Sequence, residues 1–145
     1  MSYSTDNDIL SEFTTSDLAR LTGDTSGVTI DYDRIEHARA DADSIINGYL
    51  VGRYPLPLEE PLDPLIIKLS VDLTVVHLFE FAYSKGTMPN TIVWRRINAL
   101  KVLKDLMNGS AGLMLNPVPN LNSGKVLCSK EATGAYSETN LNEYP

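Results

Sequence analysis

The sequence predicts an all-α protein: a small bundle of four helices, one short and three long, with an extended, largely non-helical C-terminal arm. Apolar residues recur with the 3.6-residue period of a helix over three long segments, and Gly or Pro stands at their boundaries. Residues 110–145 lose this period and are rich in Gly, Ser, Thr, Asn and Pro. Within the 145 residues we therefore expect a flexible N-terminus (1–12), a helical domain (13–109) and the arm (110–145).

Start and stop signals define the first two predicted helices. The short helix covers Ser16 to Leu21, after the capping residue Thr14 and before Gly23. The second helix begins at about Asp31 and ends near Val51, just before Gly52. Its apolar stripe has helical spacing and consists of Ile35, Ala38, Ala42, Ile45 and Tyr49.

The third and fourth predicted helices differ in how much of their surface is apolar. The third begins near Asp63, with Pro64 suited to its first turn, and ends near Ser84. It is apolar on nearly every side, which predicts a buried central helix. The fourth covers Asn90 to Asn108. We expect its core face to consist of Val93, Ile97, Leu100, Leu103 and Met107, and its solvent face of Arg95, Arg96, Lys101 and Lys104.

Apolar residues are scattered through the arm although it has no helical period. A solvated spacer would not need them, so we expect them to bind a partner: Leu113, Leu115, Val118, Leu121, Val126, Leu127, Tyr136, Leu141 and Tyr144.

The net charge of −7 is unevenly distributed, with acids concentrated in residues 1–60 and bases in residues 61–108. A net negative charge opposes sequence-independent binding to nucleic acid, which depends on Lys and Arg. The uneven distribution suits head-to-tail packing of identical copies, and it equally suits pairing of the two halves within one chain. The candidates for salt bridges between subunits are Arg95, Arg96, Lys101, Asp41 and Asp43.

The sequence contains no recognisable catalytic or metal-binding pattern, which predicts that this protein is not an enzyme and needs no cofactor. His77 lies in the most apolar helix and His37 on a charged one, which favours a core role for the first and solvation for the second. Cys128 is the single cysteine, so no disulfide forms within the chain. No apolar run is long enough to span a membrane, and the N-terminus lacks the pattern of a signal peptide.

The segment from Gly48 to Pro55, Gly-Tyr-Leu-Val-Gly-Arg-Tyr-Pro, resembles a motif of the Mu-like phage and prophage small virion protein family. The resemblance extends to Ser16–Thr22, Ile35–Ala42, Pro64–Leu69 and Gly109–Leu113. We expect the motif to form a structural turn that sets the angle between the second and third helices, through Gly48, Tyr49, Leu50, Gly52, Arg53, Tyr54 and Pro55.

That family is similar to head–tail connector adaptors, helical proteins that form a ring of about twelve copies below the portal. The resemblance implies a structural virion protein for head completion, located at the head–tail interface and assembled in the bacterial host cytoplasm. Its implied partners are further copies of itself, the portal, and the next neck or tail-terminator protein, while packaged DNA passes through without specific binding. The alternative is a small acidic phage-encoded regulatory protein that acts on a host factor.

Overall fold

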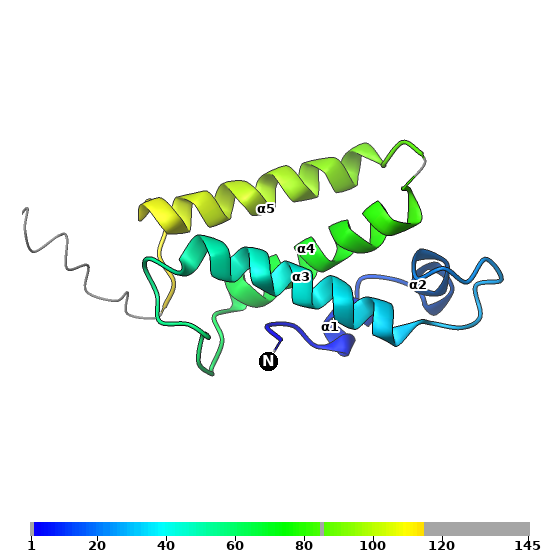
Figure 1. Cartoon of the computed structure of the whole chain (residues 1–145), viewed down its shortest axis with the longest axis horizontal. Coiled ribbons are helices and arrows are strands. Elements are labelled where there is room, and N and C mark those ends of the chain that lie inside the picture. The colour runs from blue at the N-terminus through cyan, green and yellow to red at the C-terminus, as the bar shows by residue number, and fades with distance from the viewer. Residues whose placement is uncertain (1, 85, 115–145) are drawn as a thin grey trace, which may run out of the picture.

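A computed structural model describes residues 2–84 and 86–114 of the chain. These residues form helices and no strand, which confirms the all-α prediction. The helices are α1 (Asp6–Leu10), α2 (Thr15–Leu21), α3 (Tyr32–Leu50), α4 (Pro64–Ala82) and α5 (Asn90–Asn108). The three long helices lie alongside one another, and α1 and α2 pack at one side of them (Figure 1).

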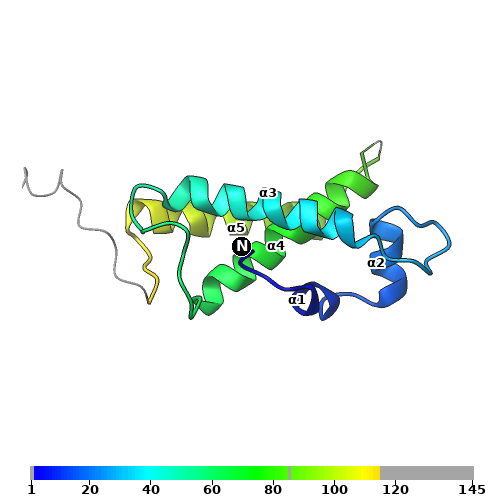
Figure 2. The same cartoon turned by 60° about the horizontal axis from the view of Figure 1, so that its bottom comes forward.

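Helix α4 is the centre of the bundle, as its apolar sequence predicts. It contacts each of the other four helices, and α3 and α5 also contact each other (Figure 2). Its fully enclosed side chains include Ile66, Val75 and Leu78. One apolar cluster lies where α3 and α4 meet α5, and a second lies where they meet α1 and α2.

Capping residues in the sequence define where the helices begin and end. The side chains of Thr14, Asp31 and Asp63 accept hydrogen bonds from the free amides of the first turns of α2, α3 and α4. Gly109 ends α5 with a φ of +83°, a left-handed conformation that favours glycine. The predicted boundaries of the four helices therefore agree with the structure within a few residues.

The N-terminal segment differs from the flexible stretch that we expected over residues 1–12. Thr5 and Asp8 form a capping box that begins α1, and Ile9 is fully buried. Tyr3 and Ser4 are each only 3 % exposed. The segment is thus part of the folded body, because buried polar groups far along the chain hold it in place.

Helix α5 is rotated relative to the sequence prediction. Its buried residues are Ile92, Ala99, Leu103 and Leu106, of which only Leu103 was expected to face the core. Val93, Ile97 and Met107, expected to be buried, are 38 %, 47 % and 47 % exposed. The helix carries two apolar stripes, and only one of them faces α3 and α4.

The arm lies outside the described residues from position 115 onward, as do its predicted contact residues Leu115, Val118, Leu121, Val126, Leu127, Tyr136, Leu141 and Tyr144. Leu113 is described, and it packs against the core of its own chain rather than standing free for a partner. Its backbone amide donates a hydrogen bond of 3.1 Å to the hydroxyl of Tyr54.

Candidate interaction surfaces

The two histidines do not meet a nucleophile within the described part of the chain. His37 is exposed on α3. His77 is half-buried, and its Nδ1 atom lies 3.3 Å from the carboxylate of Glu80. In residues 2–84 and 86–114, no group of three or more His, Cys, Asp or Glu side chains is placed to hold a metal ion.

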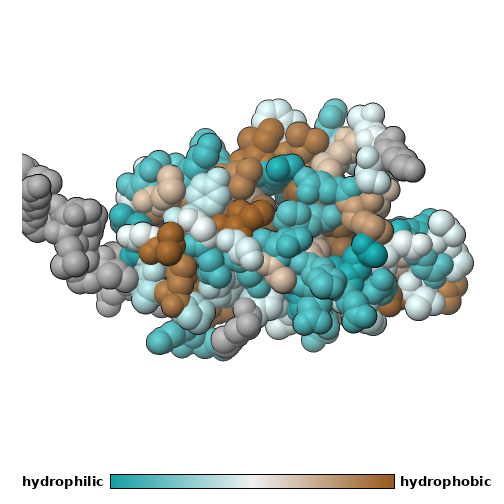
Figure 3. Space-filling model, viewed as in Figure 1, coloured by the Kyte–Doolittle hydropathy of each residue, from teal (hydrophilic) through white to brown (hydrophobic). Residues whose placement is uncertain are grey.

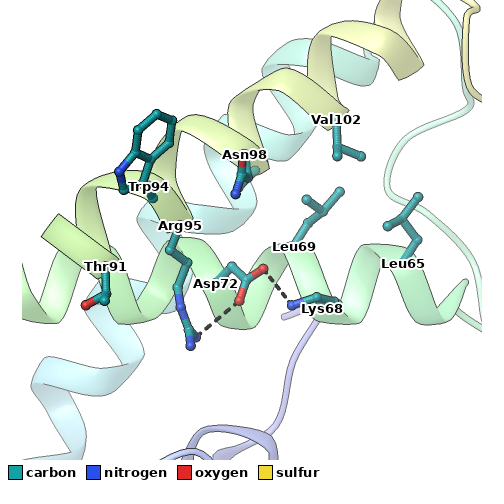
Figure 4. A pocket seen from close by; sticks show the side chains of 10 residues that line it. Leu65, Lys68, Leu69, Asp72, Thr91, Trp94, Arg95, Asn98 and Val102 are labelled. Atoms are coloured by element: carbon teal, nitrogen blue, oxygen red, sulfur yellow. Dashed lines mark hydrogen bonds and ion pairs between the residues drawn. The ribbon is translucent and has the colours of Figure 1, made fainter.

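A groove of about 500 Å³ runs between α4 and α5 (Figure 4). Leu65, Leu69 and Val102 give it an apolar lining. Asp72 marks its polar end, because its two carboxylate oxygens lie 2.9 Å from Nζ of Lys68 and 3.2 Å from Nη1 of Arg95. The pair between Arg95 and Asp72 connects the two helices, whereas Lys68 and Asp72 both lie on α4. The indole of Trp94 points away from Asp72 (Figure 4).

The residues expected to form salt bridges between subunits divide into two groups. Arg95 pairs with Asp72 and with Glu12, and Arg96 pairs with Glu80, all within the chain. Asp43 is buried and accepts hydrogen bonds inside the body, so it is not available to a neighbour. Lys101 and Asp41 are exposed, and neither forms an ion pair with another described residue.

The outward side of α5 exposes an apolar patch. Trp94 is 62 % exposed, and Val93 and Ile97 lie beside it on the same helix. Figure 3 shows hydrophobic side chains gathered along the upper side of the molecule, where α5 runs. Exposed clusters of large apolar residues mark interaction sites more often than scattered ones do.

The family-like motif covers the last turn of α3 and the turn that follows it, and it contacts the end of α5. Leu50 and Tyr54 are buried, and Tyr49 packs against them in the same cluster. The guanidinium of Arg53 lies over Gly109, where a Cβ atom would stand 2.6 Å from Nη1 of the arginine. In contrast, Gly48 and Gly52 face open space, and Pro55 is exposed.

Sequence reasoning missed the polar network that fastens the N-terminal segment. Asp43 accepts hydrogen bonds from the backbone amide of Tyr3 (3.2 Å) and from the hydroxyl of Ser70 (2.8 Å). The Ser70 hydroxyl also lies 2.9 Å from that of Ser4, and the Tyr3 hydroxyl donates to Asn47. The capping pair Thr5 and Asp8 was the one local signal for order here.

None of the described helices combines the length and apolar character that a membrane span requires.

Comparison with known proteins identifies a phage family. No curated protein matches the chain. The family described as Bacteriophage Mu, Gp36 matches residues 3–126, which is most of the 145-residue sequence. The resemblance to a Mu-like phage family is thereby confirmed, and the chain belongs to the bacteriophage Mu Gp36 family.

Proposed function

We propose that this protein is a structural subunit of the phage virion, a head–tail connector that forms a ring below the portal and joins the head to the neck or tail. The observation that carries the proposal is the exposed apolar side of α5, around Trp94, in a protein of a phage family. A subunit that completes its packing only against other proteins has a use for such a surface. The proposal assigns the chain no reaction and no cofactor.

The charge of the chain supports this assignment. Each copy carries a formal charge of −7, and a ring repeats this charge around its channel. Negative walls repel the DNA backbone, so the genome can pass through without being held. A connector needs this property, because DNA must move through the junction between head and tail.

The arm supplies the second part of the proposal. The segment beyond Met114 contains apolar residues spaced among polar ones, which suits binding to the surface of a partner. We assign it to the portal or to the next protein of the neck. The body would then form the ring, and the arm would attach the ring to the particle.

Deletion of residues 116–145 tests this division of roles in the phage that encodes the protein. We expect a truncated chain with the helical circular dichroism of the native one, absent from purified particles, and an accumulation of unjoined heads and tails. A matched control removes only the last residue, Pro145, and keeps the rest of the arm. Normal incorporation of the truncated chain would refute the role of the arm.

Complete removal of the protein tests the function itself. We expect filled heads that fail to join tails, visible by electron microscopy, with restoration by the native chain. Joined, infectious particles that lack the protein would refute the connector assignment. A stable monomer that binds a bacterial enzyme would instead support an acidic regulatory protein.

A further inference from the structure

We infer that copies of this chain associate head to tail, with the outer face of α5 from one copy packed on the outer face of α3 from the next. The α5 outer face consists of Val93, Trp94, Ile97, Lys101 and Lys104, all exposed. The α3 outer face consists of Glu36, Ala40, Asp41, Ser44 and Gly48, also exposed. The inference rests on the proposed ring and names the surfaces that would build it.

The charges of the two faces are complementary. Lys101 and Lys104 are bases on the α5 face, and none of the salt bridges within the described residues uses them. Glu36 and Asp41 are acids on the α3 face and are also absent from those pairs. Opposite charges on two different faces of one molecule favour a contact between copies and oppose a face meeting its own duplicate.

The α5 face carries one large side chain, and the α3 face offers small residues for it to pack on. Trp94 offers a large side chain that is 62 % exposed. Gly48 lies on the α3 face with nothing within 4 Å of the position of a Cβ atom, so it leaves room for a large side chain. Beside it, a hollow of about 310 Å³ is lined by the small Ala40 and Ser44 together with Ser2 and the polar and charged residues Glu36, Arg39, Asp43 and Asn47.

The spacing along the helices fixes the direction of the contact. Trp94 and Lys101 are separated by two helical turns on α5, about 10 Å, and Gly48 and Asp41 are separated by the same distance on α3. An antiparallel crossing therefore places Trp94 over Gly48 at the same time as Lys101 meets Asp41. A parallel crossing that kept Trp94 over Gly48 would instead place Lys101 beyond the end of α3 at Leu50, away from Asp41.

The two faces are available at once on a single copy. Each belongs to a helix that flanks the central helix α4 (Figures 1 and 2). Each face lies opposite the buried residues of its own helix. A copy can therefore bind one neighbour through α5 and another through α3. Contacts between unlike faces continue from copy to copy, and they close into a ring when the rotation allows it.

Charge exchange in the full chain tests the polar contact, with association measured by sedimentation at millimolar concentration. Lys101→Glu and Asp41→Lys should each weaken association about tenfold, and the double variant should recover most of the native affinity. Arg20→Glu, a matched reversal at an exposed base on α2, should leave association unchanged. A double variant no better than the single ones would overturn the pairing, as would a native chain that stays monomeric.

Mixing two defective variants tests the head-to-tail arrangement. Trp94→Ser removes the α5 contact and Gly48→Leu blocks the α3 contact, so each variant alone should be monomeric and fully helical. Their mixture retains one intact contact and should form heterodimers and nothing larger. Larger assemblies, or no association, would overturn the inference. The connector function can still hold in that case, since its own test is the joining of heads to tails.

Discussion

Asp43 is the residue on which the N-terminal segment depends. It lies on α3, 7 % exposed, and binds the backbone of Tyr3 and the side chain of Ser70 on α4. A buried carboxylate is costly unless its oxygens are hydrogen-bonded, and here both oxygens have partners. One side chain thus connects three parts of the chain that are far apart in sequence.

Replacement of Asp43 by Ala should lower the free energy of unfolding by about 2 kcal/mol, because it leaves the Tyr3 amide and the Ser70 hydroxyl without their acceptor. Urea denaturation in dilute solution measures this loss. Asp41→Ala, an exposed change two positions away, should shift the free energy by less than about 0.5 kcal/mol. Equal effects of the two changes would contradict the role assigned to Asp43.

Asp24 organises the loop between α2 and α3. Its carboxylate accepts hydrogen bonds from the Ser26 hydroxyl and from the backbone amides of Thr29, Ser26 and Val28. These donors, the Ser26 hydroxyl first, hold the pKa of Asp24 well below its usual value of 3.8. The ionised form is therefore the one that stabilises the folded loop.

The stabilisation by Asp24 should depend on pH in one direction. A pKa that is lower in the folded state contributes stability above the ordinary value of 3.8 and loses it as the pH falls below that value. The native chain should resist urea better than Asp24→Ala at pH 7, and the difference should shrink towards pH 3. A difference that grew on acidification would contradict the hydrogen-bond pattern.

At the scale of the element, the sequence predicted the positions of the long helices correctly, but it did not predict which face of α5 is buried. Periodicity and capping residues such as Asp31 and Asp63 are local, so they define where a helix begins. Helix α1 was not predicted, because it has only five residues and one buried apolar side chain, Ile9. The buried face of α5 was predicted wrongly because the helix carries two apolar stripes. Only tertiary packing determines which of the two is buried.

Two substitutions on α5 check this orientation. Leu103 is fully buried, so Leu103→Ala should lower the free energy of unfolding by about 2–5 kcal/mol. Ile97 is 47 % exposed, and Ile97→Ala should cost well under half of that in the dilute monomer. Denaturation curves of both variants under one condition make the comparison. Similar losses would mean that the stripe containing Ile97 faces the core after all.

At the scale of the whole molecule, the sequence indicated an uneven charge distribution but not how it is used. Arg95 pairs with Glu12 and Asp72, and Arg96 pairs with Glu80, all within the chain. Only the fold brings these residues together. Lys101 and Asp41 are exposed, and their assignment to contacts between copies stays a prediction. Exposure follows from helix rotation and from distant partners, and neither can be obtained from the spacing of residues alone.

Association between copies should weaken as salt is added, because the proposed contact includes exposed charges that ions screen. The shift should be several-fold between low and high ionic strength, measured by sedimentation of the native chain. The Trp94 contact is apolar and should keep some association at high salt. Association that strengthens steadily with salt would argue against the paired charges.

Asp63 has one further consequence for how the chain would respond to force. One of its oxygens caps the start of α4, and the other accepts a hydrogen bond of 2.8 Å from the amide of Met114. The polypeptide therefore leaves the described body from an anchorage on the most deeply buried helix. Tension applied to the following residues would load the beginning of α4 before it could unravel the last turn of α5.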